Sequence, residues 1–286
     1  MSRILEAKPV IQNLKAGLLQ DIKSLKDRGQ VPSIGLIRVG NRPDDVYYEN
    51  SIVKNCENMG IRPQKFTLEE NISMPDFIKL LRQVNADPGI HGIMIFRPLP
   101  QQLDEELLKH IIDPAKDIDC MSPLNQARIF AGDMSGLLPC TPAAVMEILK
   151  YYKIELQGAK AVVVGRSMVV GKPLSMMLLK ENATVTICHS KTQNMPDICK
   201  NADILVAAIG KPKFIDAKYV SPQSIVIDVG INDAGDGKMC GDVDFQAVAE
   251  QVQAITPVPG GVGSITTTLL LKNVVKAINL QKDQRV

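Results

Sequence analysis

A glycine-bounded turn that follows an apolar run is the part of this sequence best suited to chemistry. Residues 162–164 are three valines, Gly165 and Gly171 bound the turn, and residues 174–179 form an apolar segment typical of a helix. Such a connection presents free backbone N–H groups and the positive end of a helix dipole, which together bind phosphate. The spacing is not G-x-G-x-x-G, because Arg166 and Ser167 stand where a second glycine is expected. An ordinary strand–turn–helix connection explains the same residues, so both interpretations stay open here.

The end of the next predicted strand bears on which nucleotide would bind. Dinucleotide-binding units usually place an acid about 20 residues after the glycines, where it holds the ribose hydroxyls. Here the strand 183–188 ends in HSKT at 189–192, without a carboxylate. Ser190, Lys191 and Arg166 can donate hydrogen bonds to a 2′-phosphate, which an acid would repel. This favours NADP, although a basic tip can also accept NAD with an inorganic phosphate beside it.

Length and charge balance exclude several classes of protein. The chain has 286 residues, enough for two domains, and its 33 Lys and Arg nearly balance its 31 Asp and Glu. No charge excess indicates a nucleic-acid or membrane partner. The N-terminus lacks a signal-peptide core, and no apolar run reaches the roughly 18 residues that span a bilayer. We therefore expect a cytoplasmic enzyme.

Cysteine and aromatic usage supports the same class. The six cysteines are scattered without a C-x-x-C pair, and there are only three histidines, so we expect reduced thiols and no metal site. Tryptophan is absent and aromatic residues make up 4% of the chain, which argues against a stacking platform for single-stranded nucleic acid.

Strand and helix segments alternate along the chain, which predicts an α/β fold with parallel sheets and helices on both faces. Residues 139–142 (PCTP) have the character of a hinge between two domains. The last predicted helix, at 266–280, is long enough to return to the first domain. The patterns predict strands at 33–39, 62–68, 92–96, 162–164, 183–188, 204–208, 225–229 and 254–255, with helices at 8–27, 45–59, after Ser73, at 104–112 and at 143–152.

Eight short motifs appear in order along the chain. They are PCTP at 139–142, GRS at 165–167, VGKP at 170–173, CHSKT at 188–192, GKP at 210–212, DVGI at 228–231, GDV at 241–243 and TPVPGGVG at 256–263. Together they resemble the bifunctional methylenetetrahydrofolate dehydrogenase/methenyltetrahydrofolate cyclohydrolase family, and the resemblance spans nearly the whole chain. It implies an oxidoreductase and hydrolase of one-carbon metabolism and purine biosynthesis that uses tetrahydrofolate substrates and NADP and forms a homodimer.

The resemblance also implies a domain organisation and a cofactor site. It implies a folate-binding catalytic domain of αβα type at 1–139 plus 266–286, a Rossmann-like NAD(P)-binding domain at 140–265, and a folate cleft between them. Several residues match family positions that line the dinucleotide, and tight turns alone would also explain the glycines. These residues are Thr141, Gly165, Arg166, Ser167, Ser190, Lys191, Gly210, Ile231 and Thr266.

The folate site departs from the family at two positions. Relatives carry a tyrosine followed four residues later by a lysine, whereas here Tyr48 is followed by Ile52. Relatives also carry a glutamine at the end of the third strand, where Phe96 stands. The resemblance implies that Tyr48 stacks on the aminobenzoyl ring and that Asp119 accepts hydrogen bonds from the pterin. The expected substrate contacts are Tyr48, Ile52, Phe96, Asp119, Pro259, Gly260 and Gly261.

These departures have different consequences for the two activities of the family. Oxidising methylenetetrahydrofolate removes a hydride and moves no proton. The rate therefore depends mainly on how the folate and nicotinamide rings are positioned. Hydrolysing the methenyl cation requires that water be deprotonated and a ring nitrogen protonated, which is work for a lysine. The sequence therefore predicts an NADP-dependent dehydrogenase whose cyclohydrolase activity is weak or lost.

Two alternatives stay open at this point. Arg97 or Lys54 could supply a rescuing base and leave the enzyme fully bifunctional, although Lys54 lies two residues beyond Ile52, about 200° around a helix. A non-catalytic folate or nucleotide sensor would also lack catalytic residues. The intact loop at 256–263 argues against the sensor.

Overall fold

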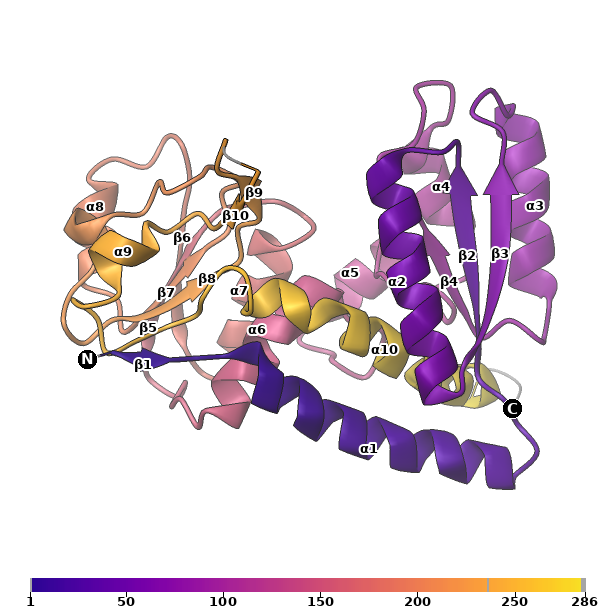
Figure 1. Ribbon diagram of the computed structural model, residues 1–286, viewed down its shortest axis with the longest axis horizontal. Helices are drawn as coiled ribbons and strands as arrows, with labels where there is room; N and C mark the ends of the chain where they lie inside the picture. Colours follow the sequence, from indigo (N-terminus) through magenta and orange to yellow (C-terminus); the bar gives the residue numbers. More distant parts are fainter. Residues whose placement is uncertain (1, 236, 284–286) are drawn as a thin grey trace. The chain divides into compact units, whose positions relative to one another are not determined.

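The computed structural model describes residues 2–235 and 237–283. The chain divides into two compact units (Figure 1). Unit 1 comprises Met1–Asn13 and Pro139–Thr266, and unit 2 comprises Leu14–Leu138 and Thr267–Val286. Within the described residues, no helix is both long enough and apolar enough to cross a membrane.

Unit 1 is built on a parallel sheet with the strand order β1-β11-β8-β7-β5-β6. A short antiparallel pair, β9 with β10, lies outside this sheet. The strands are β1 (Arg3–Ile4), β5 (Lys160–Val164), β6 (Thr184–Cys188), β7 (Ile204–Ala207), β8 (Ile225–Asp228), β9 (Asn232–Asp233), β10 (Met239–Cys240) and β11 (Ala254–Ile255).

Both faces of the unit 1 sheet are buried. Val162 and Val164 of β5 point to one face and pack with Met195 of α8 and Val248 of α9. Val163 points to the opposite face and is also fully buried, as expected for a parallel sheet covered on both sides. The helices are α6 (Cys140–Tyr151), α7 (Gly171–Lys180), α8 (Met195–Lys200) and α9 (Phe245–Val248), with short 3₁₀ turns η1 (Ala217–Tyr219) and η2 (Val262–Ser264).

Unit 2 contains a parallel sheet with the strand order β3-β2-β4, so β2 is the central strand. Asp117 extends the β4 edge through an isolated parallel bridge to Ile93. The strands are β2 (Ser33–Val39), β3 (Arg62–Leu68) and β4 (Gly92–Ile95), and the helices are α2 (Pro43–Met59), α3 (Met74–Ala86), α4 (Glu105–Ile111), α5 (Pro123–Phe130) and α10 (Thr266–Asp283). Helix α1 (Ala7–Asp27) begins in unit 1 and ends in unit 2.

Successive side chains of β2 point to opposite faces of the sheet, and this explains how the helices of unit 2 pack against it. Ile37 and Val39 pack with Phe77 of α3 and Leu108 of α4 in one apolar core. Arg38, which points to the opposite face, instead pairs with Glu49 of α2. In Figure 1, α2 and α3 accordingly lie on opposite sides of this sheet.

The α/β class with parallel sheets is confirmed, and the N-terminal boundary differs from the sequence expectation. Residues 1–13 were expected in the folate-binding domain but cluster with unit 1, because β1 pairs with β11 and the Leu5 N–H donates to the Ile255 carbonyl at 2.8 Å. From Thr267 onward, helix α10 clusters with unit 2. Asn273 of α10 donates its side-chain N–H to the Ile118 carbonyl at 2.8 Å within unit 2.

Candidate functional site

The sheet of unit 1 has a switch point at β5. The chain leaves β5 toward β6 on one side and later returns to β7 on the other. In parallel sheets, ligands bind beyond the carboxyl ends of the strands where the order reverses in this way. The loops at this point are residues 165–170, after β5, and residues 208–211, after β7.

Glycines allow the turn after β5 to close tightly. Gly165 has φ +143°, and a Cβ atom there would lie 2.2 Å from the Ala208 carbonyl oxygen. A Cβ atom at Gly171 would lie 2.2 Å from the Gly165 carbonyl oxygen. The two glycines therefore permit backbone contacts between the β5 turn, the start of α7 and the β7 loop that no other residue type allows. Because glycines have no side chain, a pyrophosphate can approach the backbone of this turn closely.

The Ser167 hydroxyl shapes the same turn. Its Oγ accepts a hydrogen bond from the Val170 N–H at 3.1 Å, so it satisfies a donor at the start of α7. Arg166, beside it, is exposed. Ser167 thus stabilises the turn through its hydroxyl oxygen, while the exposed Arg166 side chain is available to bind an anion.

The end of β6 presents polar side chains on a fixed turn. The His189 N–H donates to Thr192 Oγ1 at 2.9 Å, and the Lys191 N–H donates to His189 Nδ1 at 3.2 Å. These bonds fix the backbone and leave the Ser190 and Lys191 side chains exposed. Arg166 lies on the turn after β5, which pairs with β6 in parallel, so these donors end at the same edge of the sheet. Together they suit a phosphate, and residues 189–192 contain no opposing carboxylate.

Asp242 is a buried carboxylate that holds the loop after β7. Its Oδ2 accepts from the Ile209 N–H at 2.6 Å and the Gly210 N–H at 3.0 Å, and its Oδ1 accepts from the Lys211 N–H at 2.9 Å. Because the Asp242 carboxylate accepts from three consecutive backbone N–H groups, it fixes the position of Gly210. The sequence motif GDV at 241–243 contained this residue, but no local spacing rule predicts its partners about 30 residues earlier.

A second buried carboxylate, Asp228, organises the neighbouring loop. Its Oδ1 accepts from the Gly230 N–H at 2.9 Å and the Asp242 N–H at 3.0 Å, and its Oδ2 accepts from the Val243 N–H at 3.0 Å. Burial raises its pKa to about 6, although the three donors oppose that rise. The loop continues to Ile231, whose side chain is 62% exposed. An exposed isoleucine on a rigid loop suits a flat apolar ligand surface.

Two further predicted cofactor residues lie at helix starts in unit 1. Thr141 lies in the first turn of α6 and is half-buried. Thr266 begins α10, and its Oγ1 donates to the Gly263 carbonyl at 3.0 Å.

The predicted folate contacts at 259–261 also belong to unit 1. Gly260 has φ +100°, and its carbonyl accepts from the Ala7 N–H at 2.8 Å. A Cβ atom at Gly261 would lie 2.3 Å from the Pro257 carbonyl oxygen, so this loop closes on itself as the β5 turn does. Pro259 and Gly260 are exposed, whereas Gly261 is buried.

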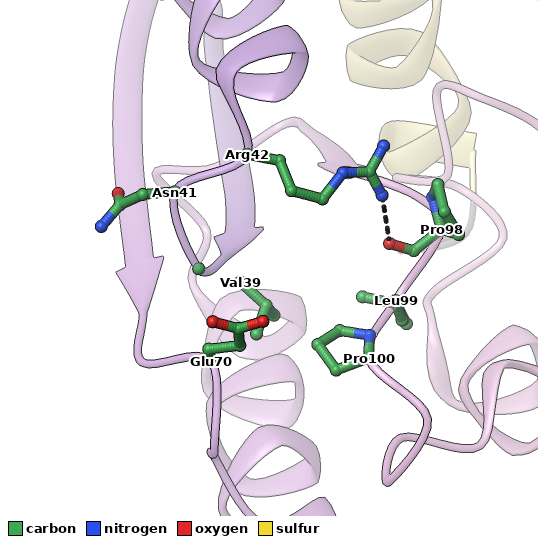
Figure 2. A pocket seen from close by; sticks show the side chains of 8 residues that line it. Val39, Asn41, Arg42, Glu70, Pro98, Leu99 and Pro100 are labelled. Atoms are coloured by element: carbon green, nitrogen blue, oxygen red, sulfur yellow. Dashed lines mark hydrogen bonds between the residues drawn. The ribbon is translucent and has the colours of Figure 1, made fainter.

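Unit 2 has its own switch point, between β2 and β4. A pocket of about 420 Å³ lies there. The Arg42 guanidinium spans it and donates to the Pro98 carbonyl at 3.1 Å, and Figure 2 shows this side chain extending toward Pro98 while Asn41 points away. The lining comes from the ends of all three strands: Val39, Gly40, Asn41, Arg42, Glu70, Pro98, Leu99 and Pro100.

The expected folate-stacking residue, Tyr48, lies beside Phe96. Their ring centroids are 6.1 Å apart at 79°, an edge-to-face contact. Ile52 is fully buried on the same helix, α2, whereas Lys54 is exposed. Buried apolar side chains therefore stand at positions 52 and 96, and the exposed Lys54 lies on another face of α2.

Arg97 pairs with two carboxylates just beyond the end of β4. Its Nη2 contacts Asp119 Oδ2 at 2.9 Å, and its Nη1 contacts Glu105 Oε1 at 3.0 Å. Burial raises the pKa of Asp119, and the neighbouring Arg97 opposes that rise. From the sequence, Arg97 is a candidate only as a substitute base, and sequence spacing does not reveal its two ion pairs.

Asp117 fixes the turn that carries Asp119. It is fully buried and accepts from the Met121 N–H at 3.0 Å, the Ser122 N–H at 2.7 Å and the Asn125 side chain at 3.0 Å. Burial raises the pKa of Asp117 to about 6, although these donors lower it. Of the two acids, Asp117 is fully buried and organises the turn, whereas Asp119, which is expected to bind the pterin, is partly exposed.

A buried ion cluster anchors the helix that bears Tyr48. Glu49, which is 2% exposed, has its Oε2 3.3 Å from both Arg38 Nε of β2 and Lys65 Nζ of β3. The cluster connects α2 to two strands one residue away from Tyr48. This attachment restricts how far Tyr48 can move relative to the sheet.

Two family models match the chain. The one described as "Tetrahydrofolate dehydrogenase/cyclohydrolase, catalytic domain" matches residues 5–119. The one described as "Tetrahydrofolate dehydrogenase/cyclohydrolase, NAD(P)-binding domain" matches residues 139–282. Together they cover parts of both units.

Known proteins are similar over the same length. "Bifunctional protein FolD 1" of Desulfitobacterium hafniense (strain Y51) is 64% identical over 281 residues, which cover 98% of this chain and 100% of that protein. The crystal structure of the bifunctional methylenetetrahydrofolate dehydrogenase/cyclohydrolase FolD from Campylobacter jejuni has a TM-score of 0.95 at 38% identity, covering 98% of this chain and 100% of its own. The Trypanosoma brucei enzyme, complexed with NADP cofactor and inhibitor, has a TM-score of 0.91 at 30% identity, covering 100% and 99%.

Proposed function

Because the chain belongs to the tetrahydrofolate dehydrogenase/cyclohydrolase family, we propose that it oxidises methylenetetrahydrofolate with NADP and has little or no cyclohydrolase activity. The observation that carries the proposal is the apolar pair Ile52 and Phe96, which are 0% and 3% exposed. Neither side chain can accept or donate a proton. Hydride removal needs no such group, whereas hydrolysis of the methenyl cation does.

The two substitute bases considered from the sequence receive no support from the local geometry. Arg97 is held by Glu105 and Asp119, and a guanidinium does not release its proton in a protein. Lys54 is exposed on a different face of α2 from the buried Ile52. A fully bifunctional enzyme would need a base from elsewhere.

Tyr48 and Asp119 are the residues that we assign to folate binding. Tyr48 would stack on the aminobenzoyl ring, with Phe96 supporting its edge. Asp119 would accept hydrogen bonds from the pterin amino group and ring N–H, which orients the substrate without moving a proton. Bound NADP would supply the hydride acceptor, and Tyr48 and Asp119 would orient the reacting carbon of the folate.

NADP is the cofactor that the donors of unit 1 support. Arg166, Ser190 and Lys191 are exposed, and no carboxylate lies at the end of β6. The fixed loops of Gly165, Gly210 and Ile231, with Thr141 and Thr266 at helix starts, would complete the site. The Trypanosoma brucei relative is complexed with NADP. NAD with a separate phosphate is the alternative.

On this proposal unit 1 is the nucleotide-binding domain and unit 2 is the folate-binding domain. We also propose a homodimer, as the family resemblance implies. Sedimentation equilibrium of the purified protein would give twice the chain mass if this is correct and the chain mass if it is not.

A direct hydrolysis assay tests the proposal. Methenyltetrahydrofolate is added to the protein without nucleotide, and its absorbance decay is compared with that in buffer alone. We expect similar rates, while the same preparation forms NADPH from methylenetetrahydrofolate and NADP. Failure to form NADPH would favour a non-catalytic folate or nucleotide sensor, and rapid hydrolysis would favour a fully bifunctional enzyme.

A further inference from the structure

Arg97 occupies an unusual place for a charged side chain. It lies two residues beyond the end of the buried strand β4, and its side chain is only 23% exposed. Such a cation is stable only when it is paired. Its partners come from two different segments, Glu105 on α4 and Asp119 after the Asp117 turn.

The two contacts use different nitrogens of the guanidinium fork. Nη1 donates to Glu105 Oε1 at 3.0 Å and Nη2 donates to Asp119 Oδ2 at 2.9 Å. Lys109 Nζ lies 3.6 Å from the same Glu105 oxygen, so α4 contributes one acid and one base to the cluster. A planar fork held at one end by Glu105 orients the group at its other end.

The pairing leaves part of the Asp119 carboxylate available. Within the described residues, its hydrogen bond and ion pair both involve Oδ2. Oδ1 and a second lone pair of Oδ2 can still accept hydrogen bonds. The side chain is 30% exposed, so a ligand can reach it.

Resting on the proposed folate-binding role of Asp119, we propose that Arg97 is a substrate-positioning residue. It fixes the Asp119 carboxylate through Oδ2, so that Oδ1 faces the pterin donors, and Glu105 holds Arg97 in that orientation. The charge of Arg97 also opposes the rise in the pKa of Asp119 that burial causes. Arg97 touches neither reacting carbon and acts only through Asp119.

A double-mutant cycle with a direct binding readout tests this role. The affinity for tetrahydrofolate is measured by calorimetry for the unmodified protein, Arg97→Leu, Asp119→Ala and the double variant. Loss of a hydrogen bond to a charged group predicts roughly 10- to 100-fold weaker binding for Arg97→Leu. In the Asp119→Ala background, Arg97→Leu should change the affinity by less than about twofold, because the two residues act as one unit. Equal losses in both backgrounds would overturn the proposal.

Conservative variants and a matched control separate positioning from structural damage. Arg97→Lys keeps the charge but not the fork, so it should restore part of the affinity, and Glu105→Gln should lose less than Arg97→Leu. Arg128→Leu is the control, because Arg128 of unit 2 pairs with a different acid, Asp133. NADP affinity and the urea midpoint should stay unchanged in Arg97→Lys and Glu105→Gln.

The outcomes distinguish this inference from the proposed function. Unchanged or tighter tetrahydrofolate binding in Arg97→Leu would show that Arg97 competes with the substrate or is irrelevant to it, and either result overturns the inference. A parallel fall in NADP affinity in all Arg97 variants would also overturn it. If the unmodified protein binds tetrahydrofolate but forms no NADPH, the proposed function fails, while the binding cycle still decides the role of Arg97.

Discussion

At the scale of residues, the site in unit 2 combines an apolar pair with a charged pair. Ile52 and Phe96 are buried, with Phe96 in edge-to-face contact with Tyr48. Arg97, which follows Phe96 in the chain, forms an ion pair with Asp119. The first pair removes a proton-transfer group, and the second orders a hydrogen-bond acceptor. Both features suit a reaction in which position matters and proton transfer does not.

Restoring the missing base should require two changes. Ile52→Lys alone would place an ammonium at a fully buried position without a partner, so we expect little hydrolysis and lower stability. Ile52→Lys with Phe96→Gln supplies the base and an orienting amide, and hydrolysis of methenyltetrahydrofolate should rise by about 10²–10⁴. Equal and additive gains from the two single variants would contradict this account.

Cofactor choice should depend on Ser190. Ser190→Asp places a carboxylate where the 2′-phosphate is expected. Like-charge repulsion should then lower kcat/KM for NADP, which corresponds to an activation free energy higher by roughly 2 kcal/mol or more. Activity with NAD should change little, and Ser190→Ala is the control for loss of the hydroxyl alone. Steady-state kinetics with both cofactors measure the effect. A higher kcat/KM with NAD than with NADP in the unmodified protein would contradict the assignment.

At the scale of elements, the turn from β5 to α7 depends on glycine. Gly171→Ala would place a Cβ atom 2.2 Å from the Gly165 carbonyl oxygen, and overpacking of this kind costs about 1–3 kcal/mol. We expect lower stability in urea and weaker NADP binding by calorimetry. Gly17→Ala in α1 is the control, because its Cβ atom would meet nothing within 4 Å. That control should gain about 0.5–1 kcal/mol from helix propensity. Unchanged NADP affinity in Gly171→Ala would show that this turn does not form the cofactor site.

Local signals in the sequence predicted the elements of the fold well. Gly60 ends α2 with φ +74°, and Ser73 accepts the Asp76 N–H at the start of α3, as expected from residue type alone. Each of these features involves residues within a few positions of one another. The β5 turn was predicted for the same reason.

The sequence did not predict the contacts that organise the site. Asp242 holds Gly210, and Arg97 holds Asp119, across separations that no helix or strand period relates. The clustering of residues 1–13 with unit 1 likewise depends on β1 pairing with β11, about 250 residues later in the chain. Long-range pairing of this kind is set by tertiary packing, which local patterns do not encode.

At the scale of the whole molecule, buried acids should make stability depend on pH. Burial raises the pKa of Asp117 to about 6, above the roughly 3.9 of an exposed aspartate. As the pH falls from about 6 to about 4, the folded chain therefore binds a proton that the unfolded chain does not, and this group's contribution to the free energy of unfolding rises by about 3 kcal/mol. Asp117→Asn removes this contribution but leaves Asp228 in place.

Urea unfolding of both proteins across this range gives the comparison. The stability advantage of the unmodified protein over Asp117→Asn should grow toward low pH. A difference that is constant with pH would show that Asp117 does not take up a proton in the folded state.

We propose above all that the chain oxidises methylenetetrahydrofolate without hydrolysing the product. The most direct measurement follows NADPH and methenyltetrahydrofolate together, from their separate absorbance bands, while the unmodified protein turns over with NADP. We predict that methenyltetrahydrofolate accumulates nearly one for one with NADPH in the early phase. If NADPH forms while methenyltetrahydrofolate stays at a low steady level, hydrolysis keeps pace with oxidation, and the interpretation of Ile52 and Phe96 is wrong.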